Sequence, residues 1–107
     1  MPSKRVEILT FDGCPNAQAA EDLVGRVLMD LEIEAEVAAI RVEDADAAER
    51  LRFLGSPTIR VAGHDVEPGA DARTDYTLAC RIYAAEGGLS NLPNEDWVRA
   101  ALVGRDT

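Results

Sequence analysis

Two cysteines, Cys14 and Cys80, are the residues of this 107-residue chain best suited to chemistry. Cys14 follows an apolar run and precedes Pro15, a residue that fits the first turn of a helix because its missing N–H removes no hydrogen bond there. Unpaired N–H groups at a helix start stabilise a thiolate, which is the form that acts as a nucleophile or soft-metal ligand. We therefore predict a reactive thiol at Cys14. The alternative is a small buried hydrophobic residue at a strand end.

Cys80 stands beside Arg81, whose positive charge would favour a thiolate. It also belongs to an alternating series that is typical of a strand with one buried face, so a core position is favoured over a chemical one. That series is Tyr76, Leu78, Cys80 and Ile82. If the fold brought the two Cα atoms within about 7 Å, the cysteines could form a disulfide or a two-thiolate metal site.

The remaining residues indicate neither a metal centre nor a cofactor. His64 is the only histidine, and its place between Gly63 and Asp65 is typical of a solvated turn. A zinc site would need carboxylates in addition to these few ligands, and no closely spaced ligand pair exists. The chain also lacks the glycine-rich loop of the phosphate-binding kind.

Composition narrows the class of protein further. Twenty acidic and eleven basic residues give a net charge of -9, which disfavours nucleic acids and anionic membrane surfaces as partners. No apolar run reaches the roughly 18 residues of a membrane span, and the start does not resemble a signal peptide. Two cysteines do not form a disulfide framework. We expect a single domain over residues 1–107, located in the cytoplasm with reduced thiols.

The first half of the chain predicts a parallel strand–helix–strand unit. Residues 6–11 are rich in Val, Ile, Leu and Phe, which is typical of a central strand buried on both faces. Residues 16–31 repeat apolar side chains every three or four positions and so predict a helix. Residues 37–42 form a second short apolar run. A connection of helix length between two strands favours a right-handed crossover and parallel pairing.

A shorter helix and an edge hairpin are expected next. The helix covers about residues 46–54, and Gly55 follows where a left-handed cap belongs. Residues 58–61 alternate as a strand, residues 62–65 supply turn residues, and residues 66–67 begin a return strand that the next proline ends.

The last third is less regular until its end. The alternation over residues 76–82 predicts a strand, and Gly87-Gly88 predicts a turn. Asn94 precedes two acidic residues and an apolar stripe, a pattern that predicts a closing helix. Together these elements predict an α/β fold with a mixed sheet of about four strands and helices on both faces.

Two local motifs carry a resemblance to a known family. Gly13-Cys14-Pro15-Asn16 and Gly55-Ser56-Pro57-Thr58 resemble the segments of the thioredoxin-like superfamily that hold a reactive cysteine and an opposing cis proline. The chain is also similar to small bacterial thioredoxin-like proteins sometimes labelled alkylmercury-lyase-like, which share these motifs and a Cys-Arg-x-Tyr segment, here residues 80–83. The resemblance implies a thioredoxin-like fold, a cis Ser56–Pro57 bond, and a backbone at that proline which accepts an extended substrate.

The sequence departs from the superfamily at two positions. Ala17 stands where working thioredoxins have their second cysteine, and Gly13 replaces the usual tryptophan, so a vicinal dithiol is excluded. The resemblance then implies a single-cysteine thiol–disulfide oxidoreductase with Cys14 as nucleophile, Cys80 as candidate resolving thiol, and a protein or small-molecule thiol or disulfide as partner. Its expected substrate-binding residues are Pro15, Ser56, Pro57, Thr58 and Arg81.

Two alternatives remain open at this point. The first is a non-enzymatic binding module that keeps the thioredoxin-like fold, which both departures favour. The second is binding of a soft metal ion or a mercurial by Cys14 and Cys80 together, because thiolates are the ligands that such ions prefer.

Overall fold

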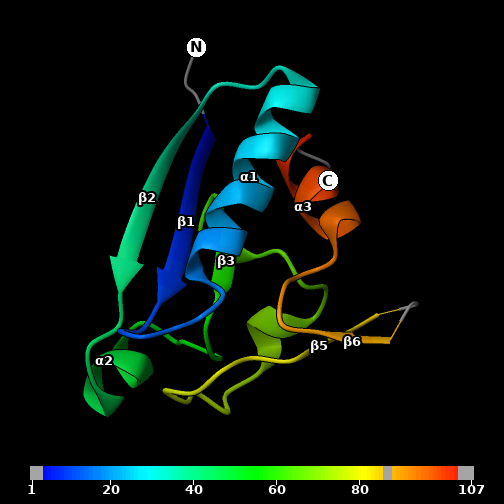
Figure 1. Ribbon diagram of the computed structural model, residues 1–107. Coiled ribbons are helices and arrows are strands. Elements are labelled where there is room, and N and C mark those ends of the chain that lie inside the picture. Colours follow the sequence, from blue (N-terminus) through cyan, green and yellow to red (C-terminus); the bar gives the residue numbers. More distant parts are fainter. Residues whose placement is uncertain (1–3, 86–87, 104–107) are drawn as a thin grey trace.

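The computed structural model describes residues 4–85 and 88–103, which form an α/β arrangement of a mixed sheet and surrounding helices (Figure 1). A four-stranded sheet has the order β2-β1-β3-β4, and a separate two-stranded hairpin consists of β5 and β6. The elements are β1 (Lys4–Thr10), α1 (Ala17–Leu31), β2 (Ala35–Arg41), α2 (Ala45–Arg50), β3 (Thr58–Val61), β4 (His64–Asp65), the 3-10 helix η1 (Ala70–Ala72), β5 (Tyr83–Ala85), β6 (Gly88–Ser90) and α3 (Glu95–Leu102).

The sheet has β1 at its centre and the hairpin at its edge. β1 runs parallel to β2 and antiparallel to β3, so the predicted crossover through α1 is confirmed. β3 and β4 form the predicted edge hairpin. Its turn is shorter than predicted, because Val61 already pairs with His64. His64 therefore lies on the return strand, not in the turn.

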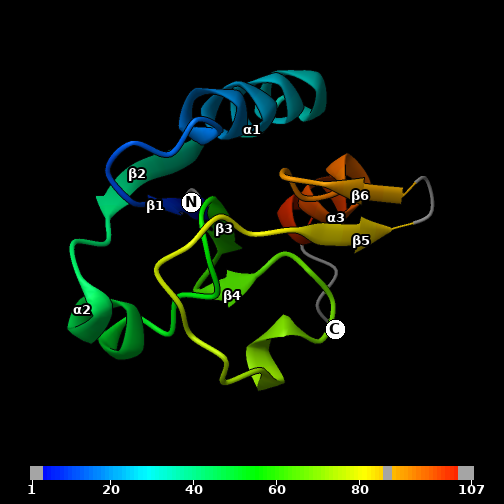
Figure 2. The ribbon, with the colours of Figure 1, turned by 60° about the horizontal axis from the view of Figure 1, so that its bottom comes forward.

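Helices cover both faces of the sheet, as the sequence predicts. Figure 1 shows α1 and α3 side by side in front of the sheet, and Figure 2 shows α2 on the other side. Neighbouring residues of β1 enter two separate cores because side chains alternate along a strand. Ile8 joins Leu23, Val27 and Val98 from α1 and α3, whereas Leu9 joins Val42, Ala47 and Phe53 around α2.

The end of α2 differs from the sequence prediction. The helix ends at Arg50 instead of continuing to Leu54, and Arg52 adopts a left-handed conformation with φ 57°. The backbone N–H groups of Arg52 and Phe53 donate to carbonyls of the last helical turn at 3.2 and 2.8 Å. These two bonds are those of a left-handed helix cap, in which glycine is the favoured residue. The predicted cap at Gly55 is therefore wrong, and an arginine occupies the position instead.

The predicted strand over residues 76–82 is also wrong. Its one ladder contact is an isolated bridge between Ser56 and Cys80, and regular pairing begins only at Tyr83. The apolar side chains of the alternating series face outward, with Leu78 39% and Ile82 63% exposed. The interior position on this segment belongs to Arg81. The predicted Gly87-Gly88 turn lies partly outside the described residues.

The starts of α2 and α3 agree with the sequence prediction. Asn94 accepts a hydrogen bond from the N–H of Asp96 at 2.7 Å at the start of α3, and Asp44 accepts one from Ala47 at 2.8 Å at the start of α2. The longest helix, α1, has 15 residues. Within residues 4–85 and 88–103, no helix is long and apolar enough to cross a membrane.

Candidate functional site

Two distant segments meet at the start of β3. The Ser56–Pro57 bond is cis, the configuration that the resemblance implies. The N–H of Ser56 donates to Ala79 O, and the N–H of Arg81 donates to Ser56 O, both at 2.9 Å, so Cys80 lies alongside Ser56. The backbone edge that the resemblance assigns to an extended substrate is therefore occupied by a segment of the chain itself.

Gly55 is required for this close approach. It has φ 122°, and a Cβ at this position would lie 2.9 Å from the Cβ of Arg81 and 3.1 Å from Ala79 O. Any side chain would clash with the backbone that follows Cys80 and would strain its own backbone. Gly55 thus allows the two segments to pair, and this is its role in place of capping α2.

Arg81 fixes the second segment through a buried ion cluster. Its Nη1 lies 2.8 Å from Asp65 Oδ2 and its Nη2 lies 2.6 Å from Glu67 Oε1. Nη1 also donates to Thr58 Oγ1 at 2.9 Å, and the guanidinium lies 4.3 Å from the centre of the Tyr83 ring. Burial alone would lower the pKa of Arg81, but the hydrogen bond to Asp65 and the charge of Asp65 raise it. The guanidinium therefore stays charged in the interior.

This position changes the role expected for Arg81. The side chain is 3% exposed and turned toward the carboxylates, not into solvent beside Cys80. A buried cation needs such partners because its desolvation is costly. Arg81 thus holds the backbone of the Cys80 segment and does not provide a substrate contact at the surface.

The proline loop is held from the inside as well. The Tyr83 hydroxyl donates to Pro57 O at 2.6 Å, and burial raises the pKa of that hydroxyl. Thr58 Oγ1 donates to Gly55 O at 2.6 Å. Ser56, Pro57 and Thr58 are all buried, so these three predicted substrate-binding side chains form the support of the loop and not its surface.

Cys14 and Pro15 lie outside the helix that they are predicted to open. The first residue of α1 is Ala17, and the N–H of Cys14 donates to Phe11 O at 3.2 Å within a tight turn. Gly13 takes φ 87° in that turn, which completes the reversal before the helix begins. Cys14 is half-buried and Pro15 is exposed. The predicted placement of both residues in the first turn of the helix is therefore wrong.

The turn that carries Cys14 and the segment that carries Cys80 border one open hollow of about 410 Å³. It is lined by Phe11, Asp12, residues 41–43 and Leu78, and neither cysteine is among the lining residues. Both cysteines are free thiols, and Cys80 is exposed. Among the described residues no hydrogen bond joins Cys14 or Pro15 to the group around Ser56. The same residues contain no group of three or more side chains placed to hold a metal ion.

Sequence reasoning missed the residues that orient the Cys80 segment. Asp65 and Glu67 stand two positions apart near an edge strand, where alternate side chains point the same way. That spacing was the available signal for a paired acidic site. The cation that they bind comes from Arg81, and local sequence does not reveal a contact between segments so far apart.

No protein-family model matches the chain, and no curated protein is significantly similar to it.

Proposed function

We propose that this chain is a thioredoxin-like thiol–disulfide exchange protein in which Cys14 is the nucleophile and Cys80 is the resolving thiol. The observation that carries the proposal is the position of Cys80 beside Ser56, in the loop that the second motif marks. In the superfamily that the two motifs resemble, this edge receives the backbone of a substrate. Here the chain itself presents an exposed thiol at that edge.

The chemistry has two steps. The Cys14 thiolate attacks one sulfur of the partner's disulfide, forms a mixed disulfide, and releases the other sulfur as a thiolate. The Cys80 thiolate then attacks the Cys14 sulfur, forms a Cys14–Cys80 disulfide, and releases the second sulfur of the partner. The partner's disulfide gains two electrons and the protein dithiol loses two. Two equivalents of a small-molecule thiol then reduce the Cys14–Cys80 disulfide and are themselves oxidised to a disulfide, as a reducing compartment such as the cytoplasm allows.

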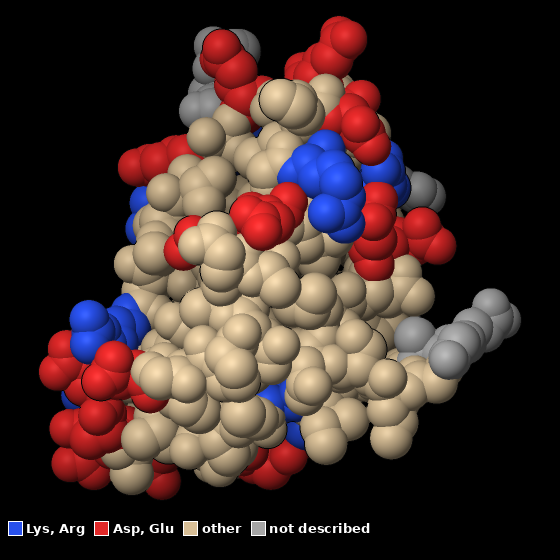
Figure 3. Space-filling model, viewed as in Figure 1, with Lys and Arg blue, Asp and Glu red and all other residues tan. Residues whose placement is uncertain are grey.

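The surface around the two thiols is mostly uncharged, apart from Asp12, Arg41 and Glu43 in the hollow beside them, where Asp12 and Arg41 form an ion pair at 3.4 Å. On the face that carries the start of α1 and the segment leading into β5, the central area is largely uncharged (Figure 3). Acidic side chains gather instead over α2 and near the far end of α1 (Figure 3). Pro15, Leu78 and Ile82 are exposed and uncharged. This arrangement suits an apolar stretch of a protein, or a small-molecule disulfide, better than a charged substrate.

The test is treatment of the native protein with oxidised glutathione, followed by intact mass measurement and peptide mapping without reductant. The proposal predicts a Cys14–Cys80 disulfide in the unaltered protein. Cys80→Ser removes the resolving thiol and so accumulates a glutathione adduct on Cys14, whereas Cys14→Ser reacts slowly or not at all. An inert Cys14 together with a freely reacting Cys80 would contradict the nucleophile assignment.

A non-enzymatic binding module is the second candidate. Two observations favour it: Cys14 precedes α1 by three residues, and the Ser56 edge is already paired within the chain. Both remove features that would activate a nucleophile or admit an extended substrate. This candidate predicts that Cys14→Ser leaves partner binding unchanged while thiol exchange with glutathione is already slow in the unaltered protein.

A further inference from the structure

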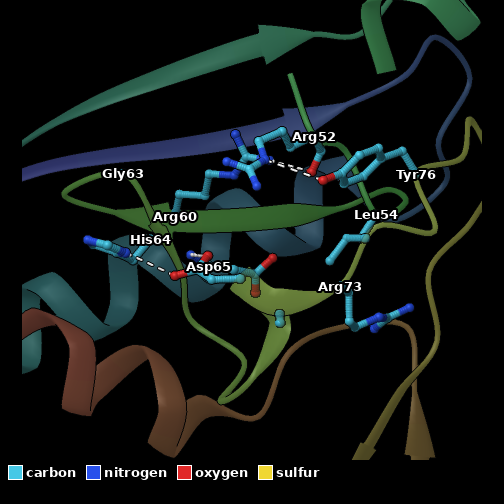
Figure 4. Close-up of a pocket in the computed structure, with 10 residues that line it drawn as sticks. Arg52, Leu54, Arg60, Gly63, His64, Asp65, Arg73 and Tyr76 are labelled. Carbon is cyan, nitrogen blue, oxygen red and sulfur yellow. Dashed lines mark hydrogen bonds and ion pairs between the residues drawn. The ribbon is translucent and has the colours of Figure 1, made fainter. Parts of the chain in front are cut away.

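A second hollow, of about 250 Å³, lies between the end of α2, the β3–β4 hairpin and the chain that follows η1 (Figure 4). Its lining includes Arg52, Arg60, Asp71 and Tyr76. None of these residues belongs to the cysteine site. The volume is smaller than that of a typical drug-sized pocket, so it suits a small ligand or one chemical group of a larger one.

Three arginines line this hollow, and two of them, Arg52 and Arg60, form no ion pair with a described residue. Among the described residues, no carboxylate lies within ion-pair distance of Arg52 or Arg60, although Arg73, Arg81 and Arg99 each bind at least one. Figure 4 shows Arg52 and Arg60 converging beside the Tyr76 hydroxyl. In a chain with 20 acidic residues, two adjacent arginines that form no ion pair favour the binding of an external anion.

The donors in the hollow are already oriented. Arg60 Nη2 donates to Leu51 O at 2.7 Å and to Arg52 O at 2.9 Å, which fixes the guanidinium and leaves its Nε and Nη1 without described partners. Arg52 Nε donates to the Tyr76 oxygen at 3.3 Å, so both Nη groups of Arg52 remain available. The Tyr76 hydroxyl accepts that bond and keeps its own proton for a ligand.

The backbone at Arg52 is shaped by the helix cap. Its φ of 57° is the left-handed conformation at a helix cap, where glycine would be unstrained.

Two carboxylates line this hollow. Asp65 is already paired with Arg81 at 2.8 Å, so Asp71 is the group that opposes anion binding. Asp71 lines it, with its carboxylate held by His64 Nδ1 at 2.9 Å and by the N–H of Asp65 at 3.2 Å. Burial would raise the pKa of Asp71, but these hydrogen bonds and the charge of His64 and of Arg60 lower it, so the group is anionic at neutral pH. Its removal should therefore strengthen the binding of an anion.

We propose that this hollow binds the phosphate group of a small molecule, with Arg52 and Arg60 neutralising its charge and Tyr76 donating a further hydrogen bond. A phosphate presents three oxygens and close to two negative charges, which matches two guanidinium groups and a hydroxyl. A carboxylate has one charge and two oxygens, so it leaves one of these donors unmatched.

The test is a titration of the native protein with inorganic phosphate or acetate at constant ionic strength, followed by amide NMR shifts around Arg52 and Tyr76. Phosphate should give saturable shifts and bind about tenfold tighter than acetate. Arg52→Gly should weaken phosphate binding about tenfold or more, while the fold is kept because glycine suits the cap. Asp71→Asn should tighten it.

Two control variants separate the hollow from general charge and backbone effects. Arg50→Gln removes the same charge two positions away without touching the lining, and Glu32→Gly makes the same kind of backbone change at the end of α1. Both should bind phosphate as the unaltered protein does. The proposal is overturned if no shift saturates, if acetate binds as tightly as phosphate, or if Arg50→Gln weakens binding as much as Arg52→Gly. Neither cysteine is involved, so failure here leaves the proposed thiol exchange untouched.

Discussion

The strand–helix–strand unit over β1, α1 and β2 and the segment from residue 66 to residue 82 reach stable structures in opposite ways. In the first, apolar side chains recur at regular spacing and are buried, as with Leu23 and Val27. In the second, the alternating apolar side chains are exposed and a charged one, Arg81, is buried. Periodicity shows which residues share a face, but the available partners decide which face becomes the interior.

Those partners are the carboxylates of Asp65 and Glu67. A guanidinium is stable in the interior only where its charge and its hydrogen-bond donors have partners. The two carboxylates form ion pairs with Arg81, and the Tyr83 ring lies against its guanidinium. Once Arg81 points inward, the side chains on either side of it must point outward. Cys80 is exposed for this reason.

The largest expected effect comes from breaking the buried ion cluster. Arg81→Met should lower the free energy of unfolding by roughly 3–5 kcal/mol, because the carboxylate of Asp65 is left buried and unpaired. The Asp65 side chain is only 5% exposed, so water cannot replace the lost partner. Urea denaturation measures the change.

The matched control is Arg73→Met, since Arg73 binds Asp75 and Glu67 at the surface. Arg73→Met should lower the free energy of unfolding by no more than about 1 kcal/mol, as expected for exposed ion pairs. Equal losses for the two variants would show that burial adds nothing to the cluster at Arg81.

A cavity in the core of the β1–α1–β2 unit should lower the free energy of unfolding. Leu23→Ala removes a buried side chain from α1 and should cost roughly 2–5 kcal/mol through lost transfer free energy and the space left behind. Met29→Ala on the exposed side of the same helix is the control, because Met29 is 77% exposed. Thermal and urea unfolding compare the two. A loss below about 1 kcal/mol for Leu23→Ala would contradict its place in the core.

The difference between these regions also explains what could be predicted from the sequence. The unit of β1, α1 and β2 and the β3–β4 hairpin follow from local periodicity and turn residues, and both are confirmed. The closing helix follows from Asn94 and the apolar stripe behind it. These signals act over a few residues, so a single sequence contains them.

The sequence predicts the candidate site only in part. The motifs locate Cys14 and the Ser56–Pro57 loop, but they do not show that Cys80 pairs with Ser56, because that contact joins distant segments. The sequence also places the start of α1 too early, because a tight turn through Gly13 delays the first helical residue to Ala17. The cap at Arg52 was unpredictable because glycine is the favoured residue there and Gly55 lay nearby.

Glycine substitutions at the ends of α1 and α2 should slightly raise the free energy of unfolding. Arg52 and Glu32 both adopt left-handed backbone, with φ 57° and 54°. Replacement by glycine relieves that strain but makes the unfolded chain more flexible, so each variant should gain about 0.5–1 kcal/mol at most. Urea unfolding of Arg52→Gly and Glu32→Gly measures it. A clear loss for Arg52→Gly alone would mean that its bond to Tyr76 contributes more to stability than the strain costs.

The smallest effect is expected where the alternating pattern is most misleading. Ile82→Ser should change the free energy of unfolding by no more than about 0.5 kcal/mol, because its side chain is already 63% exposed. Its neighbour provides the contrast: Tyr83→Phe removes the hydroxyl that donates to Pro57 O, and an unpaired buried carbonyl costs about 1–3 kcal/mol. Parallel urea titrations of the two variants test both. If Ile82→Ser instead cost more than Tyr83→Phe, the apolar series would face the interior after all, and the burial of Arg81 could not be what turns Cys80 toward solvent.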